Sequence, residues 1–222
     1  RYGIMAELTA SNRVGMHRYT FPASDDSGII IDLMNGGCWD RPVDTFIEPC
    51  GDNAVRGYRF SRGWADDQKV YFYAEFSKPY NDLNIHSIDY KPYYAKADFE
   101  TREGEQILMK VALSPVSMEN AYENMQAELP DWDFDKTVTE AENAWNDELR
   151  IIRIETDDDD ARKIFYTALY HSMIAPSTFS DIDGSYRGAD GKSYDSAGHQ
   201  TYTTFSLWDT YRGAMPLYSI FQ

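Results

Sequence analysis

The residues with the clearest potential for chemistry lie together at positions 203–212. Trp208, Asp209 and Arg212 fall within five positions there. An indole offers an apolar platform for the C–H face of a sugar, and a carboxylate and a guanidinium can hydrogen-bond to its hydroxyls. The same spacing fits a structural arrangement, in which a buried Trp stands beside an Asp–Arg ion pair at a helix start. Spacing alone leaves both interpretations open.

Two other patterns invite a functional interpretation and have plainer explanations. Asp181-Ile182-Asp183-Gly184 sets carboxylates at alternate positions, as calcium ligands often are. Its glycine stands at position 4, and Lys192 occupies position 12, where an EF-hand loop needs a glutamate. We therefore expect an Asp-Gly turn. We expect the histidines to be hydrogen-bonded structural residues, and only His199, in a polar loop, is placed for another role.

Composition limits the classes of partner. The chain has 222 residues, a formal net charge of −16 and 15% aromatic residues. Such acidity argues against nucleic acid or an anionic membrane surface as a partner. The sequence contains no run of 18 or more apolar residues, the length that a membrane-spanning helix needs. Cys38 and Cys50 could form one disulfide in an oxidising compartment or remain two buried thiols.

The first half of the chain has the alternation of β-strands. Apolar and polar residues alternate at 4–9, 13–21, 70–76 and 107–113, and 29–33 is a short apolar run. Clusters of Gly, Pro, Asn and Asp separate these segments, which is typical of an antiparallel sandwich. The stretch 78–98 carries Pro and Asn at several positions, so we expect loops and one short strand there.

Helical spacing takes over after Pro115. Residues 138, 141, 145 and 149 share one face of a helix that starts at Asp133 or Asp135. Residues 151–154 suggest a short extended connector. The acidic run 157–160 suits the N-terminus of a second helix, which Pro176 ends. A polar loop follows at 177–204, and the helical pattern from Ser206 either kinks or divides into two helices near Pro216.

Several segments together resemble glycoside hydrolase family 92, the exo-α-mannosidases. They are 57–65, 71–79, 165–172, 181–188 and the motif Phe205-Ser206-Leu207-Trp208-Asp209-Thr210-Tyr211-Arg212. They occur in the family's order across nearly the whole chain. The resemblance implies a β-sandwich (supersandwich) packed on an (α/α)6 toroid. It also implies a Ca2+-dependent enzyme that releases terminal α-linked mannose, in α-1,2 or related linkages, with inversion.

Inversion uses a general acid and a general base about 6.5–9.5 Å apart, with water between them. The resemblance places the acid Glu, the base Asp and most calcium ligands beyond Gln222. It assigns Asp209 to a mannose hydroxyl, Arg212 to orienting Asp209 or contacting the sugar, and Phe205 and Trp208 to the pocket wall. It further implies export to the periplasm or cell surface.

We therefore expect a multidomain chain, β then α. Residues 1–115 would form an incomplete N-terminal sandwich, 116–156 a helical linker and 157–222 the start of the catalytic toroid. The chain begins without an initiator Met and stops within a helical pattern, so we expect a piece of a longer protein, inactive by itself. The alternatives are another sandwich-plus-toroid α-glycosidase or phosphorylase, and a non-catalytic sugar-binding module.

Overall fold

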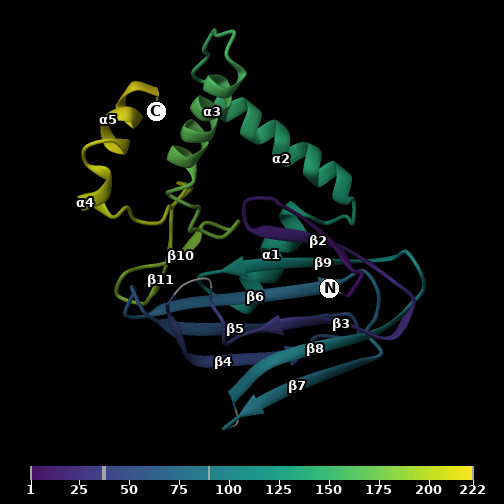
Figure 1. The fold of residues 1–222 in the computed structure, drawn as a ribbon. Coiled ribbons are helices and arrows are strands. Elements are labelled where there is room, and N and C mark those ends of the chain that lie inside the picture. Colours follow the sequence, from purple (N-terminus) through teal and green to yellow (C-terminus); the bar gives the residue numbers. More distant parts are fainter. Residues whose placement is uncertain (1, 37–38, 90, 222) are drawn as a thin grey trace.

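A computed structural model describes residues 2–36, 39–89 and 91–221 of the chain. A β-rich body holds the first half, and helices follow above it (Figure 1). This order of strands and then helices confirms the sequence prediction.

Two antiparallel sheets make the body. The larger has the strand order β1-β2-β9-β6-β5-β4, and the smaller has the order β3-β8-β7. The bounds of these strands are β1 Met5–Ala10, β2 Val14–Phe21, β3 Ser24–Asp32, β4 Arg41–Pro49, β5 Ala54–Arg62, β6 Gln68–Phe76, β7 Asp82–Ile88, β8 Lys91–Thr101 and β9 Glu105–Ser114.

The main core lies between the two sheets. Phe21, Phe72 and Phe76 of the larger sheet and Phe99 of the smaller are all buried within it. Alternate residues of each strand point inward, which is why a period of two in the sequence marks a sandwich. Gly57 allows the closest approach, because a Cβ there would lie 2.0 Å from the carbonyl oxygen of Phe46.

The stretch 78–98 corrects the sequence prediction. It holds β7 and most of β8, paired as an antiparallel hairpin, where the sequence predicts loops and one short strand. β7 is exposed along nearly its whole length, so its residues carry no apolar alternation. β3 also begins at Ser24, inside a cluster of turn-forming residues that the sequence analysis treats as a boundary between strands.

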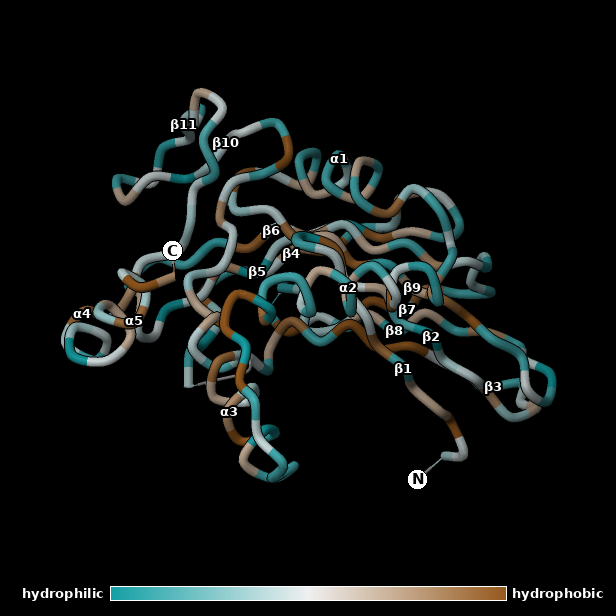
Figure 2. The backbone as a smooth tube through the Cα atoms, turned by 90° about the horizontal axis from the view of Figure 1, so that it is seen from above, coloured by the Kyte–Doolittle hydropathy of each residue, from teal (hydrophilic) through white to brown (hydrophobic). Residues whose placement is uncertain are grey.

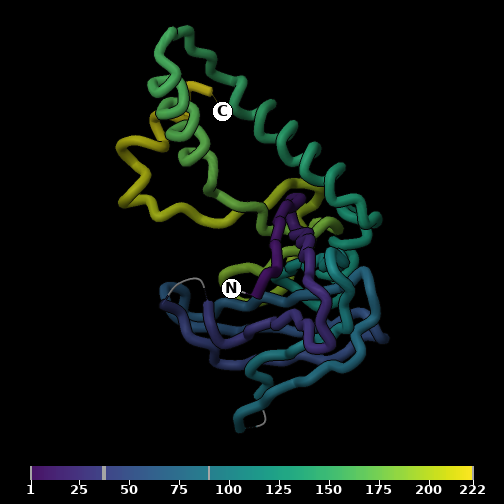
Figure 3. Tube along the Cα trace, turned by 45° about the vertical axis from the view of Figure 1, so that its right-hand side comes forward, coloured from purple at the N-terminus to yellow at the C-terminus, as the bar shows by residue number. Residues whose placement is uncertain are grey.

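Three helices follow the sheets: α1 Met118–Glu128, α2 Phe134–Leu149 and α3 Asp159–Met173. Side chains of Asp133 and Asp158 accept backbone N–H groups at the starts of α2 and α3, as the sequence predicts. α1 packs on the larger sheet through a second core that includes Met16, Ala121 and Met125. α2 then runs away from the body, and α3 returns toward it (Figure 3).

The rest of the chain is less regular than the helices before it. Between α2 and α3, residues 151 and 152 form a turn and a bend, and residues 153–156 have no regular structure. The polar loop contains a small hairpin of β10 Ser185–Arg187 and β11 Ser193–Asp195. Two helices end the described part, α4 Leu207–Thr210 and α5 Ala214–Phe221, with Pro216 at the third position of α5 rather than its first.

Apolar residues recur along the α3–α5 region (Figure 2), and Ile164, Leu207 and Ile220 are exposed there. Among the helices of the described residues, none is both long enough and apolar enough to cross a membrane.

Candidate functional site

The candidate sugar-binding residues lie on and beside the short helix α4. Trp208 is 76% exposed, and Asp209 and Arg212 are exposed with it. The guanidinium carbon of Arg212 lies 5.4 Å from the ring centre of Tyr211. Within the described residues, Asp209 and Arg212 form no ion pair. The arrangement of a buried indole beside an ion pair is therefore absent from this part of the chain.

Phe205 lies on the inner side of the same segment. Its half-buried ring packs 5.8 Å from the ring of Tyr218 in α5. The Tyr218 hydroxyl donates to the carbonyl oxygens of Ser172 and Ala175, at the end of α3. The structure thus brings Phe205 against α5, and within the described residues the Trp208 and Asp209 side chains are exposed.

The polar loop is closed at its base, just before the candidate site. The Phe179 N–H donates to the Thr201 carbonyl at 2.8 Å, and the Thr203 N–H donates to the Ser177 carbonyl at 2.9 Å. The Thr203 hydroxyl accepts the Ser177 N–H at 2.9 Å. Two stretches of backbone that are about 25 residues apart therefore run side by side, and Phe205 follows two residues after this pairing ends.

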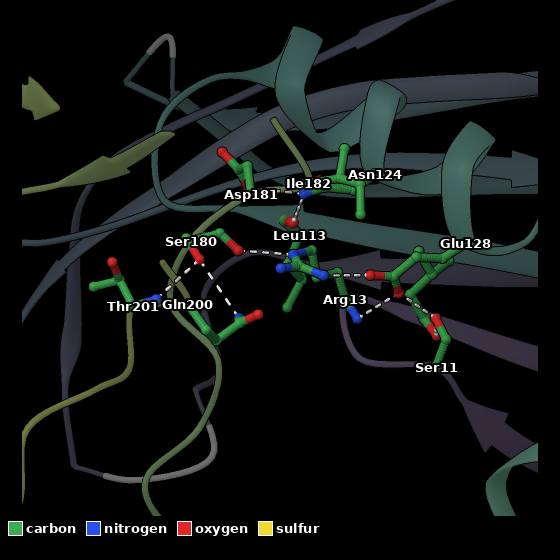
Figure 4. A network of polar contacts seen from close by, with 11 residues as sticks. Ser11, Arg13, Leu113, Asn124, Glu128, Ser180, Asp181, Ile182, Gln200 and Thr201 are labelled. Carbon is green, nitrogen blue, oxygen red and sulfur yellow. Dashed lines mark hydrogen bonds and ion pairs between the residues drawn. The ribbon is translucent and has the colours of Figure 1, made fainter. Parts of the chain in front are cut away.

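A polar network attaches that base to the sandwich and to α1 (Figure 4). Arg13, which follows the turn between β1 and β2, pairs with Glu128 of α1 at 2.6 Å. Its Nε also donates to the Ser180 carbonyl at 2.7 Å. Ser180 in turn accepts the Thr201 N–H through its hydroxyl at 3.2 Å. The network joins residues 167 positions apart in the sequence.

Asp181 is the buried centre of the same region. One carboxylate oxygen accepts the Ser114 hydroxyl at 2.6 Å, and the other accepts the Asn124 amide at 2.7 Å. Burial raises the pKa of Asp181, and these two hydrogen bonds oppose the rise. Asn124 also accepts the Ile182 N–H at 2.8 Å, so this one side chain of α1 binds two consecutive residues of the loop.

The Asp181-Gly184 stretch forms the expected turn. The Gly184 N–H donates to the Asp181 carbonyl at 3.0 Å, and Gly184 has a φ of +87°. Asp183 accepts the Asn120 amide at 3.0 Å and the Ser185 hydroxyl at 2.7 Å. Both carboxylates are thus engaged by protein donors, and residues 2–36, 39–89 and 91–221 contain no group of three or more His, Cys, Asp or Glu side chains that could hold a metal. These residues do not fit a calcium cage.

The histidines that the sequence singles out have ordinary environments. His17 shares a hydrogen bond with the Tyr19 hydroxyl at 2.7 Å, and burial lowers its pKa. His199 is exposed, and its backbone N–H donates to the Ser196 carbonyl. The Cys50 sulfur lies 3.6 Å from the Tyr73 hydroxyl. Its proposed partner Cys38 lies outside the described residues.

The sequence reasoning missed an exposed tryptophan pair on the sandwich. Trp39 and Trp64 are 70% and 77% exposed, and their rings meet edge to face with centres 6.2 Å apart. Asp40, paired with Arg59 at 2.7 Å, fixes the first of the two loops. A Cβ on Gly63 would lie 2.8 Å from the Asp40 backbone, so the loops touch closely. Trp64 belongs to the segment 57–65, which carries part of the family resemblance, and this was the only feature of the sequence that could have identified it as functional.

Comparison with known proteins gives one match for the β-rich part of the chain and another for the part that follows it. Residues 1–114 match the glycosyl hydrolase family 92 N-terminal domain, and residues 120–222 match the glycosyl hydrolase family 92 catalytic domain. A secreted but uncharacterized glycosidase of Arthroderma benhamiae is 24% identical over 214 residues, covering 80% of this chain and 27% of that protein.

Solved structures agree over almost the whole chain. A family GH92 α-mannosidase from Bacteroides thetaiotaomicron superposes with a TM-score of 0.91 and 35% identity, covering 98% of this chain and 31% of that one. A GH92 inverting mannosidase of the same organism gives 0.84 and 25%, covering 98% and 30%. This chain thus spans less than a third of the length of these relatives. It belongs to glycoside hydrolase family 92, with a stretch of the family's N-terminal domain followed by a stretch of its catalytic domain.

Proposed function

We propose that this chain is part of an exo-acting enzyme that releases terminal α-linked mannose from glycans. The observation that carries the proposal is the placement of Trp208 and Asp209 directly after the closed loop base, next to Phe205, which packs against α5. The α-mannosidase that superposes with a TM-score of 0.91 has also been solved in complex with mannoimidazole. That likeness supports a mannose-containing glycan as the substrate.

In this proposal the segment binds sugar and does not break the bond. Asp209 accepts a hydrogen bond from a mannose hydroxyl, Arg212 orients Asp209 or contacts the sugar, and Trp208 and Phe205 form the pocket wall. The general acid Glu and the general base Asp lie beyond Gln222. The acid protonates the leaving glycosidic oxygen, and the base removes a proton from the water that attacks the opposite face of the sugar, with the two carboxyl groups about 6.5–9.5 Å apart.

Several finer points belong to the same proposal. Residues 1–115 serve as the sandwich, 116–156 as a linker and 157–222 as the first part of an (α/α)6 toroid. The enzyme uses Ca2+, most of whose ligands lie beyond Gln222, and prefers α-1,2 or related linkages. It is exported, to the periplasm or the cell surface; the secreted relative supports export.

The test uses the full-length protein with an aryl α-mannoside. Asp209→Asn should lower kcat/KM by roughly 10- to 100-fold, since a hydrogen bond to a charged group contributes about 1.5–3 kcal/mol. Asp147→Asn, which changes another exposed carboxylate, on α2, is the control and should change little.

Three further readouts decide the class of enzyme. NMR should detect β-mannose as the first product, and a chelator should abolish turnover. Faster hydrolysis of an aryl α-glucoside than of the mannoside would favour the rival α-glycosidase, and mannose binding without any turnover would favour a sugar-binding module. Unchanged kinetics in Asp209→Asn would remove Asp209 from the site.

A further inference from the structure

Arg13 has one hydrogen bond that leaves the β-sandwich and reaches the polar loop, at the Ser180 carbonyl. Its Nη1 pairs with Glu128 at 2.6 Å, and the two side chains are only 10% and 11% exposed. Glu128 is held further by the Ser11 hydroxyl at 2.6 Å and by the Arg13 N–H at 2.9 Å. The Nε–H of the same guanidinium donates to the Ser180 carbonyl, 2.7 Å away.

Ser180 is one of the residues on which the loop closes. Its N–H donates to the Thr201 carbonyl at 3.3 Å, and its hydroxyl accepts the Thr201 N–H at 3.2 Å and the Gln200 amide at 3.5 Å. From Thr201 the chain needs only four residues to reach Phe205. If Ser180 moves, Thr201, which is hydrogen-bonded to it, should move as well, and the short stretch from Thr201 to Phe205 should carry that shift to the candidate site.

We propose that Arg13, on the β-sandwich, is a positioning residue for the mannose-binding segment at 205–212. It holds the Ser180 carbonyl in place from the β1–β2 turn and so fixes the direction in which the chain leaves the loop base. The inference rests on the proposed function for its effect on catalysis. Its structural part, the restraint of the loop base, stands by itself.

The geometry requires an arginine. One guanidinium reaches a carboxylate through Nη1 and a carbonyl through Nε at the same time, because its donors point in fixed, divergent directions. A lysine ammonium carries all its N–H donors on a single nitrogen, so it cannot occupy the separate positions of Nη1 and Nε, and a lysine that pairs with Glu128 is drawn away from the Ser180 carbonyl. Arg13→Lys therefore separates the ion pair, which holds α1, from the hydrogen bond, which holds the loop.

Arg18 provides a matched control. It also joins the sandwich to the helices, since it pairs with Glu7 at 2.7 Å and with Asp135 of α2 at 2.9 Å. Its guanidinium also lies 4.2 Å from the ring centre of Phe134. In the described part of the chain, its side-chain hydrogen bonds go to Glu7 and Asp135 rather than to residues 177–204. Arg18→Ala should weaken the attachment of α2 without releasing the loop.

The experiment compares Arg13→Ala, Arg13→Lys and Arg18→Ala in the full-length protein by hydrogen exchange. We expect amides at 177–181 and 199–204 to exchange at least about tenfold faster in both Arg13 variants and to stay unchanged in Arg18→Ala. Kinetics on an aryl α-mannoside should show kcat/KM lower by about 10- to 100-fold in the Arg13 variants, because small misplacements of binding groups slow catalysis strongly. KM and the affinity for a mannose-like inhibitor should account for part of that loss.

The outcomes separate the two claims. Equal exchange at the loop base in Arg13→Lys and wild type would overturn the positioning role, whatever the kinetics. Faster exchange at the loop base with unchanged kcat/KM would show that the loop base does not position the site. That result would also overturn the positioning role of Arg13. Absence of mannosidase activity in the wild type would refute the proposed function, and the exchange result would still decide whether Arg13 restrains the loop. If Arg13→Ala fails to fold, Arg13→Lys decides alone.

Discussion

The substitution Asp181→Asn tests whether the loop is anchored by acceptors that nothing else can replace. The change preserves the shape of the side chain and replaces one carboxylate oxygen with an NH2 group. In the structure both oxygens accept, one from Ser114 at 2.6 Å and one from Asn124 at 2.7 Å. The new NH2 must face one of these two partners.

Neither partner can accept it. The Ser114 hydroxyl oxygen already accepts the N–H groups of Val116 at 2.9 Å and Ser117 at 3.2 Å. The Asn124 amide donates to the Leu113 carbonyl at 3.0 Å, and its oxygen accepts the Ile182 N–H, so a flip would break both bonds. A buried donor without an acceptor costs about 1–3 kcal/mol.

A smaller effect opposes this cost. Burial penalises the charge of Asp181, as the raised pKa indicates, and the amide carries no charge. We expect a net loss of about 2 kcal/mol, which corresponds to roughly 30-fold more frequent opening of the anchored loop. Hydrogen exchange at the Ile182 amide, whose N–H is bound by Asn124, measures that opening directly.

Asp183→Asn is the control, because Asp183 is exposed and water can satisfy its amide. It should raise exchange at Ile182 by no more than about threefold, the range of ordinary surface substitutions. Exchange in Asp181→Asn as slow as in wild type would refute the reasoning from saturated acceptors.

Two other predictions concern the sandwich. Gly57→Ala should lower stability by about 3 kcal/mol, because its Cβ would lie 2.0 Å from the Phe46 oxygen, whereas Gly104→Ala, with open space around it and a φ of +74°, should cost only about 1 kcal/mol. Thermal unfolding compares the two, and equal shifts in Tm would contradict the steric argument. The second prediction concerns pH. The hydrogen bond from Arg59 lowers the pKa of Asp40 in the folded protein. The pair therefore stabilises the fold fully above the pKa of about 3.9 that Asp has in the unfolded chain, and this stabilisation is lost as the pH falls through the lower pKa of the folded protein. Tryptophan fluorescence during acid titration should therefore change at a higher pH in Arg59→Ala than in wild type, and coincident titrations would argue against it.

Local physics made parts of the fold predictable. Helix starts depend on side chains within three residues of the cap, so the sequence narrowed them to Asp133 or Asp135 and to the run 157–160; the structure has Asp133 and Asp158 as the caps. Alternation located β2, β6 and β9, because each of them buries alternate side chains. The exposed strand β7 has no buried face and therefore left no pattern.

The site was predictable only in its contiguous part. Trp208 and Asp209 stand in one short motif, and the family resemblance is enough to mark them. The supports of that motif come from distant segments, as when Arg13 reaches Ser180. Such pairings depend on how the sheets and helices assemble, and neither periodicity nor spacing carries that information.

Because the 177–204 loop is closed by hydrogen bonds at its base, the loop can change in length at its tip while the base keeps its structure. At the tip, the Gly188 and Lys192 backbones pair, and Gly191, with a φ of +79°, has nothing within 4 Å of where its Cβ would stand. Each doubling of a flexible loop costs only about 0.6 kcal/mol in closure entropy. Insertions between Ala189 and Lys192 should therefore cost little closure entropy, and their main cost should be the loss of the hydrogen bonds that Asp190 accepts from the Lys192 N–H at 3.1 Å and the Tyr194 hydroxyl at 2.7 Å.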